Sequence, residues 1–284
     1  MKVIVTQENL NRALSAVSRI ASSKTSLPIL SNILIKTENN RLCVIATNLE
    51  IASVYYVGAK IANEGSLTIP ARLVSEFVGQ LPKDNVDLKV DGTKLLISSG
   101  NYRSTINGVV ADEFPEIPTI KPTSKIVLSA TLLKQVISQT VITASHDDTR
   151  PVLTGVLCYS LDGYMYMAAT DGYRLSERRL IKTKEDFSAL IPASTLQEIA
   201  RVITDNIEEV TMLFDESQVR FSMGDVEVTS RLIDGKFPDY KQLIPASTDI
   251  TAKAKTSELG RITKIASLFA RESGGSVTLH TDET

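Results

Sequence analysis

The chain repeats itself, and this internal repeat constrains the fold more than any other feature of the sequence. Short motifs of the first half return in the same order about 123 residues later. The sequence therefore predicts two copies of one fold, each of about 120 residues. The matched pairs are Pro28-Ile29-Leu30 with Pro151-Val152-Leu153, Ala46-Thr47 with Ala169-Thr170, Ile69-Pro70-Ala71 with Ile191-Pro192-Ala193, Asp91 to Ile97 with Asp215 to Phe221, and Phe114-Pro115-Glu116 with Phe237-Pro238-Asp239.

Each copy has the pattern of two helices and about eight short strands. In the first copy, apolar residues at helical spacing predict helices over about residues 7–21 and from Ala71 to Leu81. Strands are predicted between and after them, for example Arg41 to Thr47 and both arms of the Asp91-Gly92 turn. Two helices on one face of an antiparallel sheet make an α+β fold. Free sheet edges can join neighbouring copies into one sheet, and an array whose rotation closes becomes a ring.

A third copy begins after the second. Lys255 to Arg271 has the apolar spacing of a helix, and Ser276 to Leu279 is predicted to start a strand. Three full copies would need about 369 residues, so we expect a fragment that lacks roughly 85 of them. The alternative is a protein that ends here and leaves this helix without a sheet. The predicted domains are 1–121, 122–249 and the incomplete third domain 250–284.

The composition is that of a soluble globular protein. Apolar residues make up 43% of the 284 residues and Trp is absent, so the cores must be largely aliphatic. The net charge of −2 does not by itself indicate a nucleic-acid or membrane-surface protein. Cys43 and Cys158 each lie in an apolar strand and are predicted to be buried free thiols. Without a signal peptide or a membrane span, the expected compartment is the reducing cytoplasm.

Few residues suggest chemistry. His146 and His280 are the only histidines, and neither has a Cys or His at ligand spacing. Gly274-Gly275 lacks the Lys-Ser/Thr of a phosphate loop. We therefore expect no catalytic site, no metal and no cofactor. Two alternatives stay open: a scaffold that binds protein but not DNA, and a two-domain enzyme with a site between the repeats that uses Glu116, Lys121 and Lys125.

The run from Ala168 to Leu175 ends a predicted strand in a turn that carries an aromatic residue, a cation and a leucine. Such a surface suits binding of another protein better than catalysis. The first copy shares the Ala-Thr-polar frame, but it has Leu49-Glu50-Ile51-Ala52 where the second copy has Gly172-Tyr173-Arg174-Leu175. The predicted function therefore narrows to these four residues of the second copy.

Several motifs together resemble the bacterial sliding clamps, the beta subunits of DNA polymerase III. The match runs in register along the whole chain through Met1-Lys2-Val3, Leu27 to Asn32, Ile69 to Arg72, Asp112 to Pro115, Ala169 to Leu175 and Asp234 to Tyr240. The resemblance implies a processivity factor of DNA replication, a head-to-tail homodimeric ring of three-domain protomers with helices around a central hole. It implies as partners duplex DNA, the polymerase III alpha subunit, the associated 3′–5′ exonuclease complex, the clamp loader and other clamp-motif proteins.

Cations on the helices and nearby loops are candidates for phosphate contacts, which hold DNA without reading its sequence. For any one of them, an ordinary solvated charge is an equally good interpretation. The resemblance gives most weight to Lys24 and, in the loop that contains His146, to Arg150. The candidates are Arg12, Arg19, Lys24, Arg72, Lys134, Arg150 and Arg201, and the third helix region adds Lys253, Lys255, Arg261, Lys264 and Arg271.

The resemblance also implies a groove for partner peptides and a dimer interface. Leucines of the groove could equally be core residues, Gln242 stands where the family is often basic, and the missing segment should supply the other wall. We therefore expect an incomplete groove, and a chain that does not stay loaded on circular DNA. The groove residues are Arg150, Leu153, Thr170, Gly172, Tyr173, Arg174, Leu175, Pro238 and Leu243, and the interface residues are Arg72, Leu73, Ser104, Ile106, Leu268 and Phe269.

Overall fold

The computed structural model describes residues 1–21, 27–117, 119–247, 251–270 and 277–280. The chain divides into two compact units, Met1–Phe237 and Pro238–Thr284. Both complete repeats lie in the first unit, and the helix of the third copy lies in the second. The predicted boundary near residue 121 falls inside the first unit, between the last helical turn of the first repeat and the first strand of the second.

The first repeat has the predicted two helices. Leu10, Leu14 and Val17 are buried along one face of the first helix, as their spacing requires. This helix ends earlier than predicted, because the Ser18 hydroxyl donates to the carbonyls of Leu14 and Ala71 at 2.6 and 3.2 Å and turns follow. The elements are β1 (Lys2–Thr6), α1 (Gln7–Val17), η1 (Pro28–Ser31), β2 (Asn32–Glu38), β3 (Arg41–Thr47), β4 (Ile51–Val57), β5 (Lys60–Asn63), β6 (Ser66–Pro70), α2 (Ala71–Gln80), β7 (Asn85–Asp91), β8 (Lys94–Ser99), β9 (Tyr102–Asn107) and η2 (Ala111–Glu113).

The second repeat follows the same order except that β5 has no counterpart, which confirms the repeat read from the sequence. Its helices α3 and α4 pack against each other as α1 and α2 do. The elements are β10 (Ser124–Ser129), α3 (Ala130–Thr140), η3 (Val141–Thr143), η4 (Pro151–Leu153), β11 (Gly155–Leu161), β12 (Tyr164–Thr170), β13 (Leu175–Lys182), β14 (Ser188–Pro192), α4 (Ala193–Val202), β15 (Glu209–Phe214), β16 (Gln218–Met223) and β17 (Val226–Arg231).

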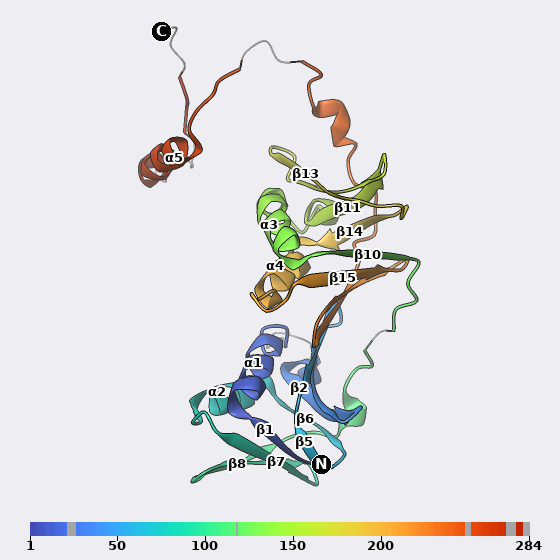
Figure 1. The fold of residues 1–284 in the computed structure, drawn as a ribbon, viewed down its shortest axis with the longest axis vertical. Helices are drawn as coiled ribbons and strands as arrows, with labels where there is room; N and C mark the ends of the chain where they lie inside the picture. Colours follow the sequence, from blue (N-terminus) through green and yellow to red (C-terminus); the bar gives the residue numbers. More distant parts are fainter. Residues whose placement is uncertain (22–26, 118, 248–250, 271–276, 281–284) are drawn as a thin grey trace. The chain divides into compact units, whose positions relative to one another are not determined.

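One sheet crosses from the second repeat into the first. Its strand order is β10-β15-β16-β17-β4-β3-β2-β6, and the joint is the antiparallel pair of β17 and β4, from Val226 opposite Tyr55 to Ser230 opposite Ile51. At one end of this strand pair, Arg41 Nη2 forms an ion pair with Asp225 Oδ1 at 2.6 Å. The prediction that sheet edges join the copies is therefore confirmed, and the fold is α+β. Figure 1 shows α1 to α4 along one side of the sheets.

The remaining strands of the first unit form two smaller antiparallel sheets. Their orders are β5-β1-β7-β8-β9 in the first repeat and β13-β12-β11-β14 in the second. One hydrophobic core cluster includes side chains of both repeats. Cys43 and Cys158 are buried free thiols, as predicted. Within the described part of the chain, no helix is long and apolar enough to cross a membrane.

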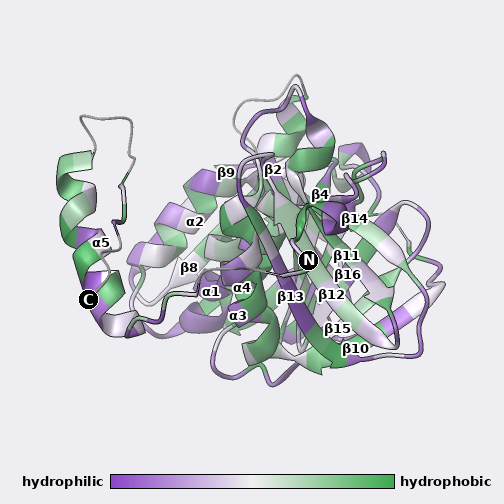
Figure 2. Cartoon of the chain, turned by 90° about the horizontal axis from the view of Figure 1, so that it is seen from above, coloured by the Kyte–Doolittle hydropathy of each residue, from purple (hydrophilic) through white to green (hydrophobic). Residues whose placement is uncertain are grey.

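The second unit contains η5 (Tyr240–Leu243) and α5 (Thr256–Ala270). The predicted third-copy helix is thus present, although Arg271 lies outside the described residues. Its apolar residues, which Figure 2 colours as hydrophobic, are exposed along the helix. The predicted strand over Ser276 to Leu279 is wrong for its described residues, since 277–280 have no regular structure. A strand needs a neighbour to bond with, and the described residues of this unit include no other strand.

Candidate functional site

The turn that follows β12 is built by two side chains, Thr170 and Asp171. The Thr170 hydroxyl donates to the Arg174 carbonyl at 2.7 Å and accepts from the Gly172 N–H at 3.0 Å. One Asp171 oxygen, Oδ1, accepts from the N–H groups of Tyr173 and Arg174 at 2.9 and 2.8 Å. These bonds satisfy the backbone inside the turn, so its side chains are free to point outward.

The first repeat contains the same turn. Thr47 donates to the Ile51 carbonyl at 2.9 Å and accepts from the Leu49 N–H at 3.1 Å, while Asn48 Oδ1 accepts from Glu50 and Ile51. Gly172 has φ +95°, and its counterpart Leu49 has φ 75°. The backbone frame therefore belongs to the fold, and the side chains at residues 172–175 are what differs.

The differing side chains form a charged and aromatic tip. Tyr173 is 94% exposed, and the Arg174 guanidinium is bound to Asp171 Oδ2 at 2.8 Å. The backbone N–H groups of Arg174 and Tyr173, followed by the Arg174 side chain, lower the pKa of Asp171 to about 2. Arg150 reaches the same place, since its Nη1 would lie 3.7 Å from a Cβ added to Gly172. The structure thus brings Arg150 together with this turn.

The other predicted groove residues are placed less uniformly. Leu153 is 7% and Thr170 is 9% exposed, so both side chains are buried, and Leu175 is half-buried. Pro238 and Leu243 belong to the second unit. There, Pro238 is exposed and Leu243 is 77% exposed at the end of η5. The Gln242 amide donates to Asp239 at 2.6 Å within the same turn.

Two of the predicted DNA-facing cations, Arg19 and Arg201, share one carboxylate. Arg19 Nη2 lies 2.8 Å from Glu198 Oε1, and Arg201 Nη1 lies 3.0 Å from Glu198 Oε2. Glu198 is only 6% exposed, whereas the arginine side chains are 42% and 60% exposed. This carboxylate on α4 therefore bridges the two repeats, a role that the sequence did not reveal. The counterpart of Glu198 in the first repeat is Glu76, which stands at the same position in α2 but is exposed. The local sequence therefore does not distinguish the buried glutamate from the exposed one.

The other predicted cations also have partners close by. Arg72 pairs with Glu76 at 2.7 Å, and Arg150 pairs with Asp147 at 3.3 Å. Lys134 Nζ donates to the Ile203 carbonyl at 2.9 Å, and Arg12 donates to the Asn9 amide oxygen at 3.0 Å. Lys24 lies outside the described residues. In the second unit, the described cations of the third helix region, Lys253, Lys255, Arg261 and Lys264, are exposed.

The residues predicted for a dimer interface differ in how accessible they are. Leu73 is 53% exposed on α2, beside the exposed Arg72, and Ser104 is half-buried on β9. Ile106 is 3% exposed and belongs to the core, so only its backbone on β9 is available. Leu268 and Phe269 are 62% and 76% exposed on α5.

The loop that contains His146 is held by local hydrogen bonds. Asp147 Oδ1 accepts from the hydroxyl and the N–H of Thr149 at 2.6 and 3.0 Å, and the hydroxyl bond is the largest cause of the lowered pKa of Asp147. Among the described residues, no three His, Cys, Asp or Glu side chains are grouped to hold a metal ion. Asp147 of this loop therefore has a structural role in holding the backbone.

Two family comparisons match the two repeats. The family described as the N-terminal domain of the DNA polymerase III beta subunit matches residues 1–118, and the family described as its central domain matches residues 127–239. The beta sliding clamp of Synechococcus elongatus is 34% identical over 258 residues, which are 86% of this chain and 68% of the relative. That of Bacillus subtilis is 32% identical over 289 residues, covering 98% and 76%.

Solved structures agree with the sequence relatives. The crystal structure of the Bacillus subtilis sliding clamp has a TM-score of 0.88 at 32% identity and covers 96% of this chain and 75% of its own. The DNA polymerase III beta subunit of Pseudomonas aeruginosa has a TM-score of 0.82 at 30% identity and covers 88% and 69%. The repeats, the joined sheet and these likenesses agree, and the chain belongs to the beta sliding clamp family, the beta subunits of DNA polymerase III.

Proposed function

We propose that this DNA sliding clamp holds duplex DNA against the helices α1 to α4 and takes partner peptides at the turn Thr170–Leu175. The proposed partners are the polymerase III alpha subunit, the clamp loader and other proteins with a clamp-binding motif. The proposed assembly is a head-to-tail ring of two protomers, acting in the cytoplasm. Members of this family are processivity factors and not catalysts, so the alternative of an enzyme with a site between the repeats is set aside.

The observation that carries the peptide-binding proposal is the comparison of the two matched turns. Both have the same threonine and Asx hydrogen bonds, but only the second presents an exposed tyrosine beside two arginines. In the first turn, Glu50 stands at the position of Tyr173, and a charged side chain there would not bind an apolar peptide. An exposed aromatic side chain flanked by arginines is typical of protein-binding surfaces.

Two features support the proposed DNA face: the cations that the helices carry, and the carboxylates that pair with several of them. Arg19, Arg72 and Arg201 are each held by a glutamate, so their net positive charge is small. Weak, non-specific attraction is what a ring that must slide needs, because phosphate contacts carry no sequence information.

The joint between the repeats supports the assembly proposal. In the first repeat, β9 occupies the position that β17 has in the second, and its outer edge has no partner among the described strands. In the second repeat, β13 occupies the position that β4 has in the first, and its outer edge also has no partner among the described strands. The joint shows that such an edge can pair with a strand of another copy of the fold. The proposed partner of the β9 edge is a strand of the third domain of another protomer.

A duplex-binding measurement tests the DNA proposal. The full chain is titrated with two fluorescent duplexes of unrelated sequence at several salt concentrations. We expect equal affinities for the two sequences and a loss of affinity as the salt concentration rises. The Arg12→Gln/Lys134→Gln variant should weaken binding and flatten the salt dependence, whereas the matched variant Arg178→Gln/Lys182→Gln, on β13, should not. An unchanged affinity in the first variant, or a preference for one sequence, would overturn the proposed DNA face.

A further inference from the structure

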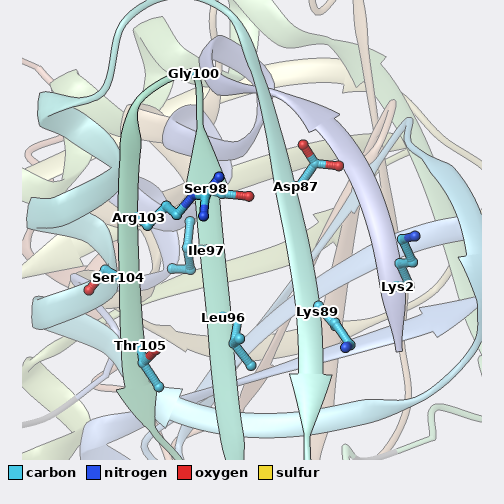
Figure 3. Close-up of a pocket in the computed structure, with 10 residues that line it drawn as sticks. All are labelled: Lys2, Asp87, Lys89, Leu96, Ile97, Ser98, Gly100, Arg103, Ser104 and Thr105. Atoms are coloured by element: carbon cyan, nitrogen blue, oxygen red, sulfur yellow. The ribbon is translucent and has the colours of Figure 1, made fainter.

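The outward face of the sheet β5-β1-β7-β8-β9 is lined by cations. Lys2, Lys89 and Arg103 line a hollow of about 740 Å³ on this face, together with Asp87, Leu96, Ser98 and Thr105 (Figure 3). Strand alternation explains the arrangement, since Val3, Leu88 and Ile97 point into the core and their neighbours point outward. Lys60 joins the same face, because it lies opposite Ile4 on the next strand.

Two of these lysines are placed directly against each other. Lys2 on β1 is the register partner of Lys89 on β7, and like charges opposite each other destabilise a sheet. All four cations are exposed, and none of them makes an ion pair with another described residue. The single carboxylate among them is Asp87. On the same sheet, Lys94 by contrast lies opposite Asp91. The sheet thus retains uncompensated positive charge on one part of its surface.

The chemistry of this face selects among anionic ligands. Its outward side chains include no aromatic ring among the described strands, so it lacks the stacking surface that single-stranded nucleic acid needs. Asp87 interrupts the positive charge of this face, which therefore suits a few spaced carboxylates better than an unbroken run of phosphates. Leu96 and Ile4 are half-buried and offer apolar contact between the charges.

We propose that this face binds an extended acidic peptide segment of a partner protein, at a site separate from the turn Thr170–Leu175. One carboxylate of the segment lies over Lys2 and Lys89, a second lies near Arg103, and an apolar side chain between them covers Leu96. Lys89 and Arg103 are two strands and two residues apart, which is about 10–12 Å. Alternate residues of an extended peptide lie on one face, and residues i and i+4 are about 13 Å apart, so the acidic residues of the segment are spaced i and i+4 with the apolar residue at i+2.

Fluorescence anisotropy with the full chain tests this site. The probe is a fluorescein-labelled peptide with glutamates at i and i+4 and leucine at i+2, and a second probe has glutamine in place of both glutamates. We expect Lys2→Gln/Lys89→Gln to weaken binding of the acidic probe at least about tenfold. The matched control is Lys94→Gln, which changes a balanced lysine on the same sheet and should leave the affinity unchanged.

Thermal unfolding of the same variants separates lost binding from lost folding. Lys2→Gln/Lys89→Gln removes a like-charge pair, so its Tm should equal or exceed that of the parent chain. Equal binding of the acidic and neutral probes would overturn the proposal, as would equal affinities in the double variant and in Lys94→Gln. Tighter, lysine-dependent binding of an oligothymidylate would also overturn it, because the ligand would then be a nucleic acid. Arg103 is left unchanged in this test, so a failure of the proposed dimer edge on β9 does not affect the result.

Discussion

Arg19 of the first repeat and Glu198 of the second form an ion pair of 2.8 Å, and the carboxylate is 6% exposed between Arg19 and Arg201. A carboxylate this buried needs its partners, because an unpaired charge away from water is costly. The single carboxylate also offsets one of the two positive charges that Arg19 and Arg201 bring to the proposed DNA face. One residue thus links the stability of the inter-repeat joint to the charge that DNA would meet.

Replacing Glu198 by Gln should therefore have two effects. We expect the free energy of unfolding to fall by about 1–2 kcal/mol, since charged hydrogen bonds are lost but both arginines are partly screened by solvent. We expect duplex DNA to bind more tightly, because Arg19 and Arg201 are released from the carboxylate. The slope of log K against log salt concentration should become steeper by about one to two. Urea unfolding and DNA titration measure the two effects. The matched control is Glu76→Gln, the exposed counterpart on α2, which should change stability by less than about 0.5 kcal/mol. Equal effects of the two substitutions would contradict the bridging role of Glu198.

The left-handed conformation of Leu49 predicts a stabilising substitution. Its φ of 75° is costly for a branched side chain, while the same place in the second repeat holds Gly172 at φ +95°. We expect Leu49→Gly to raise the free energy of unfolding by about 1 kcal/mol and Gly172→Ala to lower it by a similar amount. An alanine Cβ at Gly172 would meet no atom closer than 3.7 Å, so the expected cost is one of backbone conformation. Thermal unfolding checks both, and a destabilised Leu49→Gly would show that this side chain is needed for packing.

Asp171 predicts how the turn responds to acid. Its pKa is lowered to about 2, first by the backbone N–H groups of Arg174 and Tyr173 and then by the Arg174 side chain. Because the pKa is lowered in the folded state, this stabilisation is present above the unfolded value of about 3.9 and is lost as the pH falls through about 2. The amide NMR signals of Tyr173 and Arg174 should therefore shift only below about pH 3. Signals that shift near pH 4 would contradict the hydrogen bonds to this carboxylate.

Asp171→Asn is a control that tests the carboxylate charge separately from the turn geometry, because the first repeat has Asn at the equivalent position. Asn48 holds the first turn through its amide oxygen, so the same backbone should form with Asn at 171. The variant should lose the ion pair to Arg174 and the pH dependence, and its Tm should fall only slightly, because an exposed ion pair contributes little to stability. A disordered turn in this variant would mean that the carboxylate charge, and not the Asx geometry, holds the backbone.

The two thiols should be unreactive in the folded protein. Burial, followed by the nearby Glu38 carboxylate, raises the pKa of Cys43 to about 11, and burial also raises the pKa of Cys158. The thiolate is the reactive form, so at pH 8 a thiol reagent should label the protein only as it unfolds. Labelling of native protein on mixing would contradict the burial of both residues.

The repeat made most of the fold predictable. Apolar spacing located α1, α2 and α5, the repeat implied α3 and α4, and the recurrence of Ala-Thr-polar located the two turns that share their hydrogen bonds. The early end of α1 was not predictable, because the Ser18 hydroxyl bonds the carbonyl of Ala71, far away in sequence. The predicted strand after α5 failed in its described residues, since a strand depends on a neighbour and not on its own pattern.

Some residues of the candidate sites could be predicted from the sequence and others could not, because only some of their surroundings are local. A turn is local, so its exposed Tyr173 could be read from the sequence. Ile106 alternates with exposed residues on β9, and its burial depends on which face the helices cover. The partners of the cations come from other elements, as Glu198 does for Arg19, and the cationic face of β1, β7 and β9 exists only because three distant strands become neighbours.

Binding of a partner peptide at the turn Thr170–Leu175 is the central claim, and one calorimetric titration tests it most directly. The ligand is a peptide with the clamp-binding segment of the polymerase III alpha subunit, and the proteins are the parent chain, Tyr173→Ala/Arg174→Ala and the control Glu50→Ala in the first turn. We expect at least about a tenfold loss of affinity in the 173/174 variant and none in Glu50→Ala. Equal affinity of all three proteins would contradict the account.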